Sequence, residues 1–221
     1  MQVNRGKRSL SLEPTSPEGR EIVRKLIARS DILIANLPAS TLKSMGLDYA
    51  TVSAINPRII LVTTNAYGQT GPNAHKVGFD GIAQSMSGTV FLNGDPGAPR
   101  RALAAYVDYA TAISAAFGAI LALLARERTG RGQEVSGSLM ATALTISNTI
   151  LMEQAITKPN RIPQGNLGYS SAPADLFKCS DGHWLIAQVV GQPLWEKFCK
   201  MLGAEDWLSD PRFKDDLGRG N

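Results

Sequence analysis

The first 65 residues alternate strand signals with helix signals, and this order constrains the fold more than any other feature of the 221-residue sequence. Short apolar or alternating runs predict strands, and runs with apolar residues at helical spacing predict helices. The triplet Ser16-Pro17-Glu18 is typical of a helix start, because serine caps a helix and proline suits its first position. The expected elements are a strand at 7–12, a helix from Pro17, a strand at 31–35, a helix at 48–55 and a strand at 58–64.

This strand–helix–strand–helix–strand order predicts an α/β fold in which helices flank a sheet of parallel strands. We therefore expect a Rossmann-like, doubly wound large domain. The sequence contains no G-x-G-x-x-G pattern, which would hold a dinucleotide pyrophosphate, so an ordinary dinucleotide site has no support.

Two long helix patterns follow this alternation. Residues 67–78 form a glycine-rich loop, after which we expect Asp80 to cap a helix that ends near Gly88. Long helices are expected at 109–126 and 138–156. Both are apolar around most of their circumference, which is typical of helices enclosed in a fold or packed against a partner.

The last third of the sequence predicts a separate, smaller region. Prolines and glycines in residues 157–173 indicate a linker. Two short strand patterns then flank the turn signal Ser180-Asp181-Gly182, and Pro193 opens a helix. We divide the sequence into a large domain at 1–156, the linker, and part of a small α+β domain at 174–221.

Composition excludes several classes of protein. Hydrophobic residues are 43% and charged residues 19% of the sequence, a balance typical of globular proteins. The apolar runs break within about 12 to 15 residues, short of the roughly 20 that span a bilayer, so no membrane association is expected. The N-terminus lacks an apolar signal core, and Cys179 and Cys199 are too few for a disulfide framework, so we expect a cytoplasmic protein.

Charge and histidine placement narrow the possible ligands. The net charge of +4 is mild and spread along the chain, so we expect a small anionic ligand and no nucleic acid. His75 and His183 are far apart and have no cysteine or carboxylate at metal-ligand spacing, so no metal site is expected.

Asp108 is the one charged residue in the apolar run 104–117. An ionised carboxylate removed from water costs several kcal/mol unless it is hydrogen-bonded or paired. One interpretation is that Asp108 caps the helix expected to begin at Tyr109. The other is that it is a nucleophile, because an ionised carboxylate in a water-poor site can attack an activated acyl group. Both hold together if the cap also keeps the carboxylate ionised.

Several stretches, in this order and spacing, resemble the class III CoA-transferases of the CaiB/BaiF family, which includes formyl-CoA and carnitine CoA-transferases and the related alpha-methylacyl-CoA racemases. The resemblance spans nearly the whole chain, and its most specific part is E-R-T-G-R-G-Q followed by V-x-x-S-L. The matching stretches are N-R-G-K-R-S with T-S-P-E-G (4–19), D-I-L-I-A-N-L-P (31–38), M-G-L-D-Y (45–49), N-P-R-I-I (56–60), Y-G-Q-T-G-P (67–72), G-F-D-G-I-A-Q-S-M-S-G (78–88), V-D-Y (107–109), A-R-E-R-T-G-R-G-Q-E-V (125–135) and D-P-R-F (210–213).

The resemblance implies that Asp108 is the nucleophile of a CoA-transferase that moves CoA from an acyl-CoA to a carboxylic acid through an aspartyl intermediate. It implies coenzyme A and acyl-CoA as substrates, no bound cofactor, and an interlocked homodimer. The implied CoA-contacting residues are Leu12, Glu13, Pro14, Thr15, Asn36, Leu37, Pro38, Lys43, Lys76, Val77, Gly78 and Phe79.

The sequence also departs from the family pattern. Ser44 stands where an arginine is common, although Lys43 is adjacent, and Phe79 replaces a histidine that racemases use as a base, which favours transfer over racemisation. Family members begin with an earlier strand and continue well past Asn221, so we expect this sequence to be the central part of a longer transferase. A non-catalytic scaffold and a racemase-like isomerase are the alternatives. The acyl donor and acceptor are not predicted.

Overall fold

The computed structural model describes residues 2–168 and 170–220 and divides into two compact units. One unit comprises Met1–Thr89 and Ala102–Pro159, and the other comprises Val90–Arg101 and Asn160–Asn221. Positions 1, 169 and 221 of the predicted domains and linker lie outside the described residues. The predicted boundaries at 156 and 173 stay predictions, and the grouping of residues 90–101 with the second unit was not expected.

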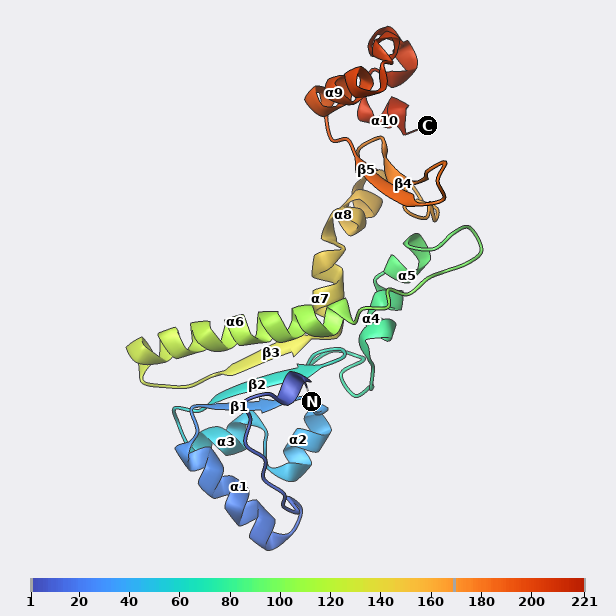
Figure 1. The fold of residues 1–221 in the computed structure, drawn as a ribbon. Helices are drawn as coiled ribbons and strands as arrows, with labels where there is room; N and C mark the ends of the chain where they lie inside the picture. Colours follow the sequence, from blue (N-terminus) through green and yellow to red (C-terminus); the bar gives the residue numbers. More distant parts are fainter. Residues whose placement is uncertain (1, 169, 221) are drawn as a thin grey trace. The chain divides into compact units, whose positions relative to one another are not determined.

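The first unit is built on a parallel three-stranded sheet, as predicted (Figure 1). Its strands are β1 (Ile32–Ala35), β2 (Ile60–Asn65) and β3 (Glu134–Ser138), in the order β1-β2-β3. In the register of the sheet, Ile34 lies opposite Val62, and Val62 lies opposite Val135. The carboxyl ends of all three strands therefore meet at one edge of the sheet.

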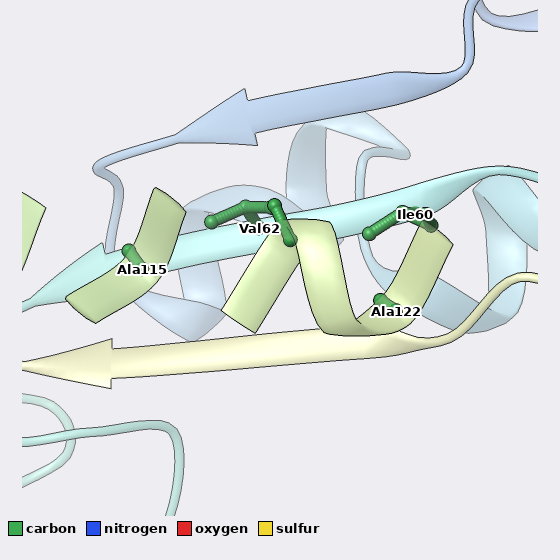
Figure 2. Close-up of a cluster of buried hydrophobic side chains, with 5 residues drawn as sticks. Ile60, Val62, Ala115 and Ala122 are labelled. Carbon is green, nitrogen blue, oxygen red and sulfur yellow. The ribbon is translucent and has the colours of Figure 1, made fainter. Parts of the chain in front are cut away.

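Helices cover both faces of this sheet (Figure 1). On one face, α1 (Pro17–Arg29) and α3 (Tyr49–Ile55) bury Leu61 of β2 and Ile59, which directly precedes this strand. On the other face, the long helix α6 (Tyr106–Thr129) covers Ile60 and Val62 with the small side chains of Ala115, Ala119 and Ala122 (Figure 2). The alternation of side chains along β2 thus gives each face its own hydrophobic cluster.

Local capping explains why two of the predicted helices begin where they do. The Ser16 hydroxyl accepts a hydrogen bond from the Gly19 N–H, and Pro17 follows at the first helical position, as predicted for α1. The Asp48 carboxylate accepts a hydrogen bond from the Thr51 N–H and caps α3 in the same way.

Three local expectations were wrong or incomplete. The strand expected at 7–12 is not formed: this segment is irregular, it pairs with no strand among the described residues, and Leu10 is 62% exposed. The helix α2 (Ala39–Met45) and the strand β3 were not expected. The helix expected at 138–156 is two helices, α7 (Leu139–Ile146) and α8 (Asn148–Thr157), which are separated at Ser147.

The remaining elements of the first part of the chain are short. They are the 3₁₀ turn η1 (Gln2–Asn4), the helix α4 (Asp80–Met86) and the helix α5 (Thr89–Leu92).

The second unit contains the hairpin and helix that the sequence predicted. Strands β4 (Ala174–Lys178) and β5 (Trp184–Gln188) pair in antiparallel fashion, and α9 (Gln192–Leu202) follows. Its small core is formed by Val189, Trp195 and Cys199. The chain then forms η2 (Glu205–Ser209), η3 (Pro211–Phe213) and α10 (Asp216–Arg219).

The outer side of α6 is apolar and exposed. Ile113 is 70% exposed and Phe117 is 62% exposed, whereas the inner side of the helix packs on β2 and β3. Within the described part of the chain, α6 is the one helix with the length and mean hydropathy (1.8) of a membrane span, so the apolar stretch is longer than the sequence analysis expected. The core helices of globular proteins meet the same criterion, and the expectation of no membrane association stays a prediction.

Candidate functional site

The start of α6 is capped by a residue from another helix. Asp80, the first residue of α4, is 5% exposed, and its Oδ2 accepts hydrogen bonds from the backbone N–H groups of Val107 (2.9 Å) and Asp108 (3.2 Å). The helix begins at Tyr106, so Asp108 lies inside its first turn and does not cap it. The expectations that Asp108 caps α6 and that Asp80 caps α4 were both wrong, since Phe79 precedes α4 without a side-chain cap.

A buried glutamine completes the support of this turn. Gln84 of α4 is fully buried, and its Nε2 donates a hydrogen bond to Oδ1 of Asp80. Its Oε1 accepts a hydrogen bond of 3.0 Å from the Ala102 N–H, which lies just before α6. Asp80 and Gln84 therefore tie α4 to the segment that carries Asp108.

A cleft of about 360 Å³ lies at the carboxyl ends of the strands, and Asp108 lines it. Asn36 follows β1, Asn65 ends β2 and Leu139 follows β3, and all three contribute to its lining. Ligands of open α/β sheets bind at this edge. Asp108 therefore lies where the fold class places substrates.

Four of the predicted CoA-contacting residues line the same cleft as Asp108. They are Asn36, Val77, Gly78 and Phe79. Val77 and Phe79 are 71% and 72% exposed, so their apolar side chains are available to a ligand.

Two other predicted residues, Pro14 and Lys43, line a second cleft of about 230 Å³ between α1 and α2. Arg20 and Arg24 of α1 join Lys43 in its lining, and the described lining contains no carboxylate. Three cations around one cleft favour an anionic group such as a phosphate.

The six remaining predicted residues line neither cleft, and their roles stay predictions. The Glu13 carboxylate accepts hydrogen bonds from the hydroxyl and the N–H of Thr15, and the hydroxyl is the main reason that the pKa of Glu13 lies below its usual range. Lys76 is exposed. The six are Leu12, Glu13, Thr15, Leu37, Pro38 and Lys76.

The electrostatic environment of Asp108 favours its protonated form. Partial burial of the carboxyl and, second, the nearby negative charge of Asp80 raise the pKa of Asp108 above its usual value. The residue nonetheless remains accessible to solvent, so the site is less dry than the nucleophile hypothesis assumed. Within the described residues, its carboxylate receives no hydrogen bond, because Asp80 occupies the nearby backbone donors.

Sequence reasoning missed Asn65, which also lines the cleft. Its Oδ1 accepts a hydrogen bond from the Gly68 N–H, and its buried Nδ2 has no partner among the described residues. An unpartnered amide N–H₂ can donate to a carbonyl or carboxylate oxygen of a ligand. The available signal was its position at the carboxyl end of an apolar strand.

Comparisons with known proteins agree with the resemblance seen in the sequence. The sequence model described as CoA-transferase family III matches residues 1–221. A relative from Chloroflexus aurantiacus, named succinyl-CoA–D-citramalate CoA-transferase, is 30% identical over 98% of this chain and 54% of its own length. A mouse protein named succinyl-CoA:glutarate CoA-transferase is 33% identical over 97% of this chain and 49% of its own length.

Solved structures share the fold. A CaiB/BaiF family protein from Brucella suis superposes with a TM-score of 0.80 at 31% identity, covering 97% of this chain and 57% of that protein. The chain spans about half the length of the curated relatives it matches.

Proposed function

We propose, because the chain belongs to CoA-transferase family III, that it moves CoA from an acyl-CoA thioester to a carboxylic acid, with Asp108 as the nucleophile. The observation that carries this proposal is the position of Asp108: it lines the cleft at the strand ends, and its carboxylate is not engaged by the backbone of its own helix. A carboxylate without hydrogen-bond donors keeps its lone pairs available for attack.

In the proposed reaction, the carboxyl of Asp108 is bonded first to the acyl group of the donor and then to CoA. A carboxylate oxygen of Asp108 attacks the thioester carbonyl carbon, the C–S bond breaks, and CoA leaves as a thiolate, which gives a mixed anhydride. The thiolate then attacks the aspartyl carbonyl, releases the donor acid as a carboxylate and forms an aspartyl-CoA thioester. The acceptor carboxylate next attacks the carbonyl of the aspartyl-CoA thioester, the C–S bond breaks, and CoA thiolate departs, which gives a second mixed anhydride. The thiolate attacks the acceptor's carbonyl carbon in this anhydride, which forms the new acyl-CoA and releases the Asp108 carboxylate.

Two features of the lining support this assignment. Asn65 Nδ2 could donate a hydrogen bond to the oxygen that becomes negative when the thioester carbonyl is attacked. Arg20, Arg24 and Lys43 of the second cleft fit the phosphates of CoA.

Transfer fits this cleft better than racemisation. Phe79 lines it where a racemase would carry a histidine, and the described lining of the cleft contains no histidine. A racemase needs such a base to remove a proton beside the carbonyl.

The names of the relatives suggest the class of substrate. The two relatives described above are named for succinyl-CoA with citramalate or glutarate. Two further relatives, from Acetobacter aceti and Escherichia coli, are named acetyl-CoA:oxalate and formyl-CoA:oxalate CoA-transferase. We therefore propose a short acyl-CoA as the donor and a small dicarboxylic acid as the acceptor.

The homodimer implied by the resemblance is also a proposal. The exposed apolar side of α6, which includes Ile113 and Phe117, supports it. Sedimentation velocity tests it: a strictly monomeric chain at micromolar concentration would refute it.

Trapping the covalent intermediate tests the reaction. The chain is incubated with succinyl-CoA, quenched with and without hydroxylamine, and its peptides are weighed. We expect a CoA adduct, or a hydroxamate after hydroxylamine, on the peptide that contains Asp108, and none in Asp108→Ala. Asp48→Asn is the matched control, because it changes an aspartate that lines neither cleft, and it should label normally. Absence of label from the wild-type peptide, or equal label in Asp108→Ala, contradicts the proposal.

A further inference from the structure

All four N–H groups in the first turn of α6 donate to acceptors other than the Asp108 carboxylate. The N–H of Tyr106 donates to the Ala104 carbonyl at 2.8 Å, and the N–H of Tyr109 donates to the Ala105 carbonyl at 3.2 Å. The two N–H groups between them donate to Asp80 Oδ2. The first N–H groups of a helix normally need a local capping side chain, and here that role is filled from α4.

An aspartate in the first turn of a helix would ordinarily turn toward these N–H groups. They lie close to it in the chain, and the positive end of the helix dipole adds to the attraction. A carboxylate bound in that way would be stabilised in its resting state and would be a weaker nucleophile. At Asp108 this alternative is blocked because the donors are already taken.

We infer that Asp80 is a positioning residue for Asp108: its carboxylate occupies the N–H groups of Val107 and Asp108, and thereby leaves the Asp108 carboxylate free to face the cleft. Gln84 holds Asp80 in this role through its hydrogen bonds to Oδ1 of Asp80 and to the Ala102 N–H. The inference rests on the proposed function of Asp108, but its structural part is measurable without substrate.

Asp80 also affects Asp108 electrostatically: among the elements packed around Asp108, it provides the charge that shifts the pKa of its carboxyl. Within the described residues, β2 and α7 carry no titratable side chain, β3 carries Glu134 at its first position, at the opposite end from the cleft, and α4 carries Asp80. The loop before α4, which also lines the cleft, carries His75 and Lys76, and both are exposed. The negative charge of Asp80 adds to burial in raising the pKa of Asp108. Moving that charge away must therefore lower the pKa of Asp108.

Two variants separate the hydrogen bonds of Asp80 from its charge. Asp80→Ala removes both. In Asp80→Asn/Gln84→Glu the amide oxygen at position 80 can still accept from the two N–H groups, while its N–H₂ donates to the new carboxylate at position 84. The other oxygen of that carboxylate accepts from the Ala102 N–H. The double variant thus keeps the pattern of hydrogen bonds and moves the charge from position 80, which caps α6, to position 84, which does not contact the N–H groups of Val107 and Asp108.

Amide hydrogen exchange tests the positioning. We expect Asp80→Ala to speed exchange at Val107 and Asp108 about five- to tenfold, the size of a lost helix cap, with the amides of Ala119 and Ala122 unchanged. The double variant should restore protection, and Asp48→Asn should change neither amide. Unchanged exchange at Val107 and Asp108 in Asp80→Ala overturns the inference, and loss of protection along all of α6 does so too, because it indicates general destabilisation.

Carbon NMR titration of the Asp108 side-chain carboxyl provides a second test. If Asp80 had only a structural role, its replacement would not change the pKa of Asp108. We expect a lower pKa for Asp108 in the double variant than in the wild-type chain, and no change in Asp48→Asn. An unchanged pKa overturns the electrostatic part of the inference. Neither measurement requires turnover, so their failure is distinguishable from failure of the proposed reaction.

In an active wild-type chain, labelling of Asp108 should be at least about tenfold slower in Asp80→Ala and should recover in the double variant.

Discussion

The two faces of the three-stranded sheet are packed in opposite ways. Toward α1 and α3, large side chains meet large side chains, as in the cluster of Ile27, Val52, Ile59 and Leu61. Toward α6, the strand residues Ile60 and Val62 meet a row of alanines. The α6 face also includes two glycines, Gly118 of the helix and Gly137 of β3.

The glycines show how closely α6 approaches the sheet. A methyl group added at Gly118 would lie 2.7 Å from Cγ1 of Val135 in β3, and one added at Gly137 would lie 3.4 Å from Cγ2 of Thr111 in α6. A helix held this close keeps its first turn near the strand ends, where Asp108 lines the cleft. The large-residue face therefore buries the larger side chains, and the small-residue face fixes the position of Asp108.

The largest expected effect is on the large-residue face. Leu61→Ala should lower the free energy of unfolding by about 2–5 kcal/mol, because the fully buried side chain leaves a cavity between the sheet and its helices. Urea unfolding monitored by circular dichroism measures it. Ile34→Ala is the matched control on β1, since Ile34 is 71% exposed, and it should cost less than about 1 kcal/mol. Equal costs at the two positions would contradict the proposed division between the faces.

A smaller effect is expected from added volume on the α6 face. Gly118→Ala should destabilise the chain by about 1 kcal/mol, because overpacking against Val135 outweighs the gain in helix propensity. In a Val135→Ala background the same change should become stabilising by up to about 1 kcal/mol. A double-mutant cycle in urea measures this coupling. Additive effects would mean that α6 does not depend on close contact at this point.

The smallest effect on stability is expected on the outer side of α6. Phe117→Arg should change the free energy of unfolding by less than about 0.5 kcal/mol, because Phe117 is 62% exposed and lies away from the sheet. It should nonetheless abolish self-association in sedimentation velocity, since a charge on an apolar contact surface opposes burial. Self-association that persists in this variant would show that another surface forms the dimer.

Elements with a local signal were predictable from the sequence. The starts of α1 and α3 were found because Ser16 and Asp48 cap them through neighbours in the sequence. In contrast, β3 was missed, because its sequence E-V-S-G-S has neither an apolar run nor a strand-like pattern and it depends on pairing with β2. The opposite error occurred at 7–12, where an alternating pattern forms no strand without a neighbour to pair with.

The candidate site was also predictable only in part, because some of its features depend on contacts between segments that are distant in the sequence. Asp108 stood out as an isolated charge in an apolar run, and four of the implied CoA-contacting residues do line its cleft. The cap on its helix could not be predicted, because it comes from Asp80, which is distant in the sequence. Asn65 was overlooked although it ends an apolar strand, because the sequence does not show that Asp108 reaches the same edge of the sheet.

If Asp108 is the nucleophile, as proposed, the cap that Asp80 supplies makes its reactivity depend on the docking of α4. If α4 detaches while α6 stays helical, the N–H groups of Val107 and Asp108 lose their acceptor, and the nearest replacement is the carboxylate of Asp108 itself. Local unfolding of α4 would therefore inactivate the nucleophile before the helix that carries it melts. Inactivation by heat or denaturant should then precede the loss of overall helical structure.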